Sequence, residues 1–205
     1  LLKEVIRAHR RIVFNGNGYT EDWVKEAGRR GLFNLPACAD AFPCFIAEKN
    51  IALFTKHHVF TREEIFSRYE IMQENYVKTI NIEAKTMCSM MYKTFLPSLL
   101  SYIETIAEAT EKTKKVLPSA PVISQEKLLS THARLYTSIS EMTEELKSAI
   151  AGADSIGDSM EKVRYFNYTV LAKMNGLRSF VDEAEALIPE SFLTYPTYDK
   201  LLFSI

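Results

Sequence analysis

The sequence predicts an all-α protein: short N-terminal helices packed on one very long kinked helix, followed by an antiparallel, coiled-coil-like three-helix bundle and an aromatic C-terminal tail. Three observations lead to this prediction. Apolar residues recur at steps of three and four between about residues 61 and 114, and at seven-residue intervals between about 128 and 188. Glycines and prolines fall between these periodic stretches, where helices are expected to end.

The N-terminal segment contains a glycine-rich turn. The glycines of residues 15–18, NGNG, end the first helix, and Thr20 is placed to cap the second. Tyr19 and Val24 have the spacing of a hydrophobic staple across that cap. The turn lacks the longer glycine pattern and the lysine of a phosphate-binding loop, so we interpret it as a connector.

A third helical stretch is predicted from about residue 36 to residue 56, with an interruption near Pro43. The long helix then begins at a capping box formed by Thr61 and Glu64, and Pro97 is expected to kink it. Its length, from residue 61 to about 114, corresponds to roughly 80 Å at 1.5 Å per residue. Part of this helix should therefore project outward or pack on something beyond this chain.

Two further helices follow a proline-rich loop at residues 118–124. Gly152 and Gly157 predict the turn between them, so the second helix should return antiparallel to the first. Two polar residues, His132 and Asn167, stand in the apolar pattern, where they would set the register at some cost in stability. The seam positions are Leu128, Leu135, Met142 and Ala149, then His132, Ile139, Leu146 and Ala153, then Met160, Asn167, Met174, Val181 and Ile188, and finally Val163, Val170, Leu177 and Ala184.

Three units are predicted along the chain: a helical segment at 1–60, the long helix and bundle at 61–188, and a docking tail at 189–205. The tail is too apolar for a free end, and we expect it to dock near the N-terminal helices or onto a neighbouring part. Its apolar residues are Phe192, Tyr195, Tyr198, Leu201, Leu202 and Phe203.

Composition and charge exclude several classes of protein. The formal net charge of −1 gives no basic surface for nucleic acid. Three cysteines, Cys38, Cys44 and Cys88, form no C-x-x-C pair and favour a reducing, cytoplasmic setting. No apolar run approaches the roughly 20 residues of a membrane span, so no membrane partner is expected.

Two clusters were considered as metal sites. His57 and His58 are adjacent and so point in different directions, which suits the end of a helix better than a metal pair. The sulfur-rich stretch at 87–92, MCSMMY, has the helical spacing of adaptable core packing rather than of a metal site. We found no hydrolase, metalloprotease, nucleotide-binding or dinucleotide-binding motif.

The stretch from His9 to Gly31, HRRIVFNGNGYTEDWVKEAGRRG, joins a basic helix end, a glycine turn and a tryptophan-bearing acidic helix. It resembles the segment just after the catalytic core of type III glutamine synthetases. The resemblance continues from Phe45 to Met87 and returns at 195–205, YPTYDKLLFSI, which looks like the C-terminus of that family. Residues 88–193 match only in helical pattern.

The resemblance implies a C-terminal, non-catalytic part of an enzyme that joins ammonia to glutamate with ATP and divalent Mg or Mn. In that family the metal, ATP and catalytic residues lie upstream, so no catalytic, cofactor-binding or metal-binding residue is assigned in this chain. The expected partners are the upstream catalytic domain of the same polypeptide and further copies in a homo-oligomer. Leu1 stands inside a helical pattern, which also led us to expect preceding sequence.

Aromatic residues are expected to carry the docking, because buried aromatic side chains dominate such contacts. The predicted docking residues are Phe14, Tyr19, Trp23, Phe45, Phe54, Tyr69, Tyr76, Tyr195 and Tyr198.

The sequence is also compatible with two other functions. A self-contained coiled-coil adaptor would bind a partner helix, and the seven-residue spacing supports it, although the seams already satisfy one another within the chain. A small enzyme with a site inside the bundle would need polar residues on the inner seams. Only His132 and Asn167 meet that requirement.

Overall fold

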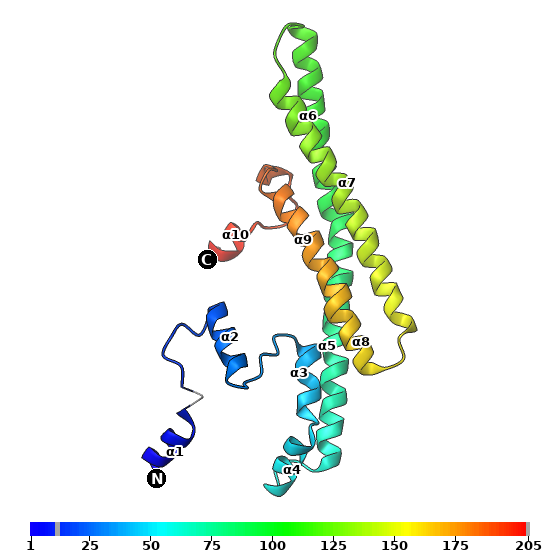
Figure 1. The fold of residues 1–205 in the computed structure, drawn as a ribbon. Helices are drawn as coiled ribbons and strands as arrows, with labels where there is room; N and C mark the ends of the chain where they lie inside the picture. Colours follow the sequence, from blue (N-terminus) through cyan, green and yellow to red (C-terminus); the bar gives the residue numbers. More distant parts are fainter. Residues whose placement is uncertain (11–12, 204–205) are drawn as a thin grey trace.

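The structure is a computed structural model that describes residues 1–10 and 13–203, apart from the side chains of residues 198 and 199. The described residues form helices and connecting turns, with no strand among them, so the all-α prediction is confirmed. The helices of the bundle lie along one another in an elongated body, and α1, α2 and α10 project from one side of it (Figure 1). The unit boundaries near residues 60 and 188 stay predictions.

Four short helices precede the bundle: α1 (Leu2–Ala8), α2 (Glu21–Arg29), α3 (Cys38–Phe45) and α4 (Glu48–Lys56). The interruption predicted near Pro43 is confirmed: Pro43 lies inside α3, which ends at Phe45, and α4 begins at Glu48. The missing N–H of a proline costs one intrahelical bond, and the helix ends within two residues of that loss.

Thr20 is the N-cap residue of α2, as predicted, but its side chain makes no capping bond. Its Oγ1 instead donates to the carbonyl oxygen of Asn17 at 2.9 Å, which closes the glycine turn. The prediction of a hydrophobic staple between Tyr19 and Val24 was wrong, because Tyr19 is 100% exposed and does not pack on Val24. Asn17 accepts from the backbone N–H of Tyr19 at 3.0 Å, and this turn directs the tyrosine outward.

The long helix runs as α5 (Arg62–Met90), a π-helical turn η2 (Met91–Phe95) and α6 (Leu96–Val116). The capping box at its start is confirmed. The N–H of Glu64 donates to Thr61 Oγ1 at 3.2 Å, and the N–H of Thr61 donates to Glu64 Oε2 at 2.8 Å. These two bonds satisfy donors that an open helix end would leave unpaired.

Replacing the cap tests its contribution. We expect Thr61→Ala to lower the free energy of unfolding by about 1 kcal/mol, as measured by urea denaturation followed by circular dichroism. The matched control is Thr105→Ala, an exposed threonine inside α6 whose hydroxyl bonds only to Ser101 of its own helix. Equal losses for the two variants would contradict the capping role.

The kink at Pro97 stays a prediction, and a π-helical turn lies directly before α6, the helix that contains this proline. Pro97 then lies in the first turn of α6, where its missing N–H costs least. A wider turn also relieves the clash between the proline ring and the preceding turn. Phe95, the last residue of the π-turn, is 0% exposed.

The bundle is completed by α7 (Ile123–Gly152), a 3₁₀ turn η3 (Ala153–Ser155), α8 (Ser159–Tyr165), a second π-turn η4 (Phe166–Val170) and α9 (Leu171–Glu185). Helices α5 and α6 pack on α7, and α7 packs on α9. The core residues share the predicted seven-residue spacing and are buried: Leu135, Ile139, Leu146, Ala149, Val163, Val170, Leu177, Val181 and Ala184. The second π-turn was not predicted, because no proline or glycine in the sequence marks it.

The two polar residues in the seams each have a local explanation. The Nδ1 of His132 lies 2.8 Å from the carbonyl oxygen of Leu128, so it donates there, and its ring meets that of Tyr102 edge-on at 5.0 Å. Asn167 Oδ1 accepts from the hydroxyl of Tyr76 at 2.6 Å. Both therefore make structural contacts in the bundle. The Nε2 of His132 is buried and has no hydrogen-bond partner among the described residues.

The tail contains a 3₁₀ turn, η5 (Glu190–Phe192), and α10 (Tyr198–Phe203). Its first half docks on the bundle, a position that the sequence did not predict. Phe192 lies 5.0 Å from the ring of Tyr102, and Tyr195 lies 6.3 Å from the ring of Phe95.

Candidate docking surfaces

The first aromatic cluster joins the glycine turn to α2. The rings of Phe14 and Trp23 lie 4.5 Å apart, and the guanidinium of Arg30 lies 5.8 Å from both ring centres. Phe14 and Trp23 are partly buried, and their rings pack on one another. Their remaining exposed area is available to a neighbour.

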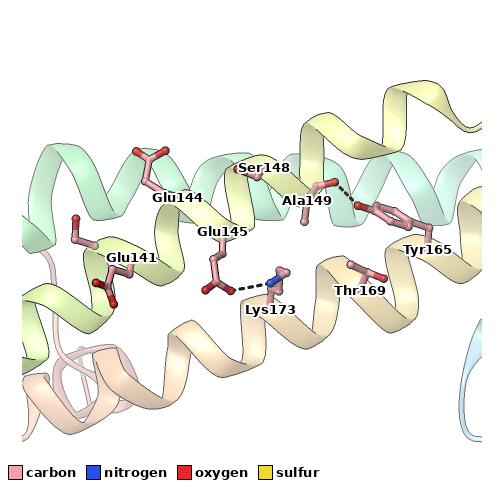
Figure 2. Close-up of a pocket in the computed structure, with 9 residues that line it drawn as sticks. Glu141, Glu144, Glu145, Ser148, Ala149, Tyr165, Thr169 and Lys173 are labelled. Carbon is pink, nitrogen blue, oxygen red and sulfur yellow. Dashed lines mark hydrogen bonds and ion pairs between the residues drawn. The ribbon is translucent and has the colours of Figure 1, made fainter.

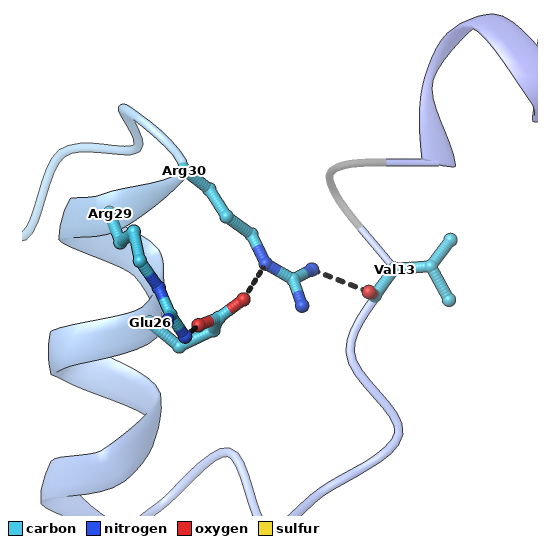
Figure 3. Close-up of polar contacts among 4 residues, drawn as sticks. All are labelled: Val13, Glu26, Arg29 and Arg30. Atoms are coloured by element: carbon cyan, nitrogen blue, oxygen red, sulfur yellow. Dashed lines mark hydrogen bonds and ion pairs between the residues drawn. The ribbon is translucent and has the colours of Figure 1, made fainter.

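Arg30 also holds this cluster in place through polar contacts (Figure 3). Its Nε donates to Glu26 Oε1 at 2.5 Å, and one terminal nitrogen donates to the carbonyl oxygen of Val13 at 2.5 Å. Arg29 pairs with the other oxygen of the same carboxylate. One carboxylate thus orients two arginines across the end of α2.

The second cluster joins α3 and α4 to the start of α5. The ring of Phe54 lies 6.0 Å from Phe45 and 5.7 Å from Phe60. Arg62 donates to Glu48 Oε1 at 2.8 Å, and the arginine side chain holds the pKa of that carboxyl below its usual value. Phe45 and Phe54 are therefore used inside the chain.

Helix α3 is attached to the bundle through tyrosines. Tyr76 meets Phe42 edge-on at 5.8 Å, and the hydroxyl of Tyr168 donates to the carboxylate of Asp40 at 2.7 Å. That hydrogen bond raises the pKa of Tyr168. Burial raises the pKa of Tyr69 and of Tyr76, which fits side chains packed within the chain.

Tyr195 attaches the tail. Burial, followed by the negative charge of Glu185, raises its pKa. The side chain of Tyr198, the other predicted tail residue, lies outside the described part of the structure. Phe42 and Tyr168 make contacts between elements, although the sequence did not single these two residues out, because only the packing shows which aromatic residues meet.

Apolar side chains remain exposed on the projecting elements. α1 has no buried residue, and Leu2 and Ile6 are 78% and 62% exposed. Leu201, Leu202 and Phe203 of α10 are also exposed, and so is Tyr19 before α2. These three elements lie on the same side of the bundle (Figure 1).

A groove of about 730 Å³ lies between α7 and the α8–α9 segment (Figure 2). Glu141, Glu144 and Glu145 line it, and Lys173 pairs with Glu145 at 2.8 Å. All three glutamates are exposed. Lys173 is the basic residue among the described residues that line the groove, and Glu144 pairs with Lys147, so the groove resembles an ordinary acidic surface.

Among the described residues, no group of three or more His, Cys, Asp or Glu side chains is placed to hold a metal ion. His57 is the C-cap residue of α4, and His58 adopts the left-handed backbone conformation that ends the helix, with φ of 54°. In the sulfur-rich stretch, Cys88 and Met91 are buried in the core.

These observations define a class of protein: an elongated all-helical domain whose exposed apolar elements face one side. The family follows from sequence comparison. The chain belongs to the family of glutamine synthetase C-terminal domains, whose family model matches residues 1–114.

Three curated relatives are similar along the chain. A glutamine synthetase of Butyrivibrio fibrisolvens is 42% identical over 100% of the chain. A type-3 glutamine synthetase of Dictyostelium discoideum is 30% identical over 99%, and a glutamine synthetase of Bacteroides fragilis (strain YCH46) is 26% identical over 100%. The similarity therefore also covers residues 88–193, where the motifs alone matched only in pattern.

The chain spans only 29%, 28% and 28% of the lengths of these three relatives. It corresponds to their C-terminal portion, and a larger region precedes it in them. No helix of the described residues combines the length and the apolar character needed to cross a membrane.

Proposed function

We propose that this chain is the helical, non-catalytic C-terminal part of a type III glutamine synthetase, where it braces the catalytic domain and contributes to assembly of a homo-oligomer. The parent enzyme would join ammonia to glutamate using ATP and Mg or Mn, with these cofactors bound upstream of this chain. The cytoplasm is the expected setting.

One observation supports the bracing role most directly. Helix α1 has an apolar face of Leu2, Val5 and Ile6 that nothing in the described part of the chain covers. A helix of seven residues is too short to be stable alone in water, so it needs a partner surface. The preceding region of the same polypeptide, present in the longer relatives, is the nearest candidate.

The aromatic and apolar residues near α1 extend this surface. Helices α2 and α10 lie on the same side of the bundle as α1 (Figure 1), and the exposed Tyr19 directly precedes α2 in the chain. Large aromatic side chains and a neighbouring arginine are the residue types that contribute most to interfaces. Together they would form one docking side, with the rigid bundle behind it.

The test is made in the complete polypeptide. We expect the double substitution Leu2→Asp/Ile6→Asp to uncouple this domain from the preceding region, because each change places a charge on the apolar face. Differential scanning calorimetry should then show two separate transitions in place of one, and sedimentation velocity should show a smaller assembly.

The matched control is Lys3→Asp/Arg7→Asp, which places the same residues on the polar face of α1. It should leave the single transition and the assembly unchanged. If the apolar-face variant behaves like this control, the docking role of α1 is wrong. A self-contained adaptor remains an alternative, but no contact in the structure favours it.

A further inference from the structure

A second groove lies between α5, the end of α7 and α8, on elements that the docking side does not use. Its volume is about 580 Å³, which is within the usual range for sites that bind small molecules. Its floor is apolar and includes Val77, Ile150 and Phe166. Burial raises the pKa of the Cys88 thiol, so this group is neutral and extends the apolar floor.

Three lysines come to this groove from three different helices. Lys85 lies on α5, Lys147 on α7 and Lys162 on α8. Lys147 pairs with Glu144 at 3.6 Å, and its ammonium also lies 5.8 Å from the ring of Tyr92. Asp154 is the acidic residue among the lining residues, so the formal charge of the lining is +2. Three ammonium groups around one groove attract an anion into it.

The groove also contains a polar atom whose hydrogen bonding is unfulfilled. The Oδ1 of Asn81 is buried and has no hydrogen-bond partner among the described residues. Buried acceptors of this kind are rare in folded proteins and are normally satisfied by a ligand, an ion or water. Because Asn81 lines the groove, a rotation of its side chain would bring this oxygen to a bound molecule that carries an N–H or O–H group.

Both π-helical turns contribute to this groove. Tyr92 belongs to η2 and Phe166 belongs to η4, although the two turns are far apart in the sequence. Single π-turns inside α-helices are frequent at functional sites, because they displace side chains from the regular helical positions. Two of them at one groove are a further indication independent of its charge.

We propose that this groove binds a small organic anion that has an apolar body and one hydrogen-bond donor. The anionic group would lie among the three ammonium groups, the apolar body would lie on the floor, and the donor would bond to Asn81 Oδ1. This site is separate from the docking side, so it does not depend on the function proposed above.

The experiment uses the complete polypeptide and 8-anilinonaphthalene-1-sulfonate, which has a sulfonate, an aromatic body and an N–H group. Equilibrium dialysis counts the probe molecules bound per chain. We expect Lys85→Glu/Lys162→Glu to remove one bound probe per chain. The control Lys115→Glu/Lys127→Glu reverses two exposed lysines near the tip of the α6–α7 hairpin and should remove none. Equal binding by both variants would overturn the proposal.

A second pair of probes isolates the role of Asn81. Asn81→Leu should weaken binding of the anilino probe about tenfold, the equivalent of roughly 1.4 kcal/mol. It should leave binding of 1-naphthalenesulfonate, which lacks the N–H group, unchanged. Equal effects on both probes would contradict the predicted hydrogen bond. Displacement of either probe by sodium sulfate, at an ionic strength matched with sodium chloride, would show that the apolar floor is not used.

Discussion

Replacing Phe95 by alanine is expected to lower the free energy of unfolding by about 4 kcal/mol. The ring is fully buried, lies at the end of the first π-turn and meets the tail at Tyr195. Its removal leaves a cavity between helix and tail that the rigid bundle cannot fill by a small shift. Urea denaturation followed by circular dichroism measures the loss.

The control for this substitution is Leu100→Ala, five residues further along the same helix. Leu100 is 52% exposed, so its truncation removes little buried area, and a loss below about 1 kcal/mol is expected. A similarly small loss for Phe95→Ala would show that the π-turn is not part of the stable core.

The second large effect is expected at the tail. Tyr195→Ala should lower the free energy of unfolding by about 2 kcal/mol, because the substitution removes the buried apolar area of a partly buried aromatic ring. It should also loosen α10, which follows this attachment in the chain and is further held by the ion pair of Lys200 with Glu190. Limited proteolysis should then cut after Leu193 in the variant much faster than in the unaltered protein.

A double-mutant cycle tests whether the two effects are connected. If Phe95 and Tyr195 stabilise one another directly, the double variant should lose less than the sum of the single losses by about 0.5–1.5 kcal/mol. Strict additivity would mean that each ring packs mainly on other neighbours. Tyr195→Phe serves as a control for the hydroxyl, since it keeps the ring.

The predicted docking aromatics differ in how much of their surface the chain itself buries. Phe45, Phe54 and Tyr76 were chosen as docking aromatics, and the structure places them in contacts within the chain. Tyr19, by contrast, is fully exposed, and Phe14 and Trp23 retain exposed area. An aromatic residue in a sequence indicates that burial is favourable, but it does not say which surface provides that burial.

The groove between α5, α7 and α8 brings together three lysines that are distant from one another in the sequence. Lys85, Lys147 and Lys162 each have the spacing of an ordinary solvent-facing helical position, so no local pattern groups them. They come to one groove because α7 and α8 both pack on α5. Convergence of this kind depends on distances between helices, which local patterns do not contain.

The sequence by itself determined the helices, the capping box at Thr61, the reversal near Gly152 and the family. The helices, the capping box and the reversal follow from interactions between residues a few positions apart, which a periodic pattern records directly. The family follows from the resemblance of whole segments to known sequences. Only the tertiary structure decided where the tail docks, that a π-turn interrupts the helix at residues 166–170, and which polar groups share a groove. These features depend on contacts between residues distant in the chain, where shape and packing select among arrangements that the local pattern permits equally.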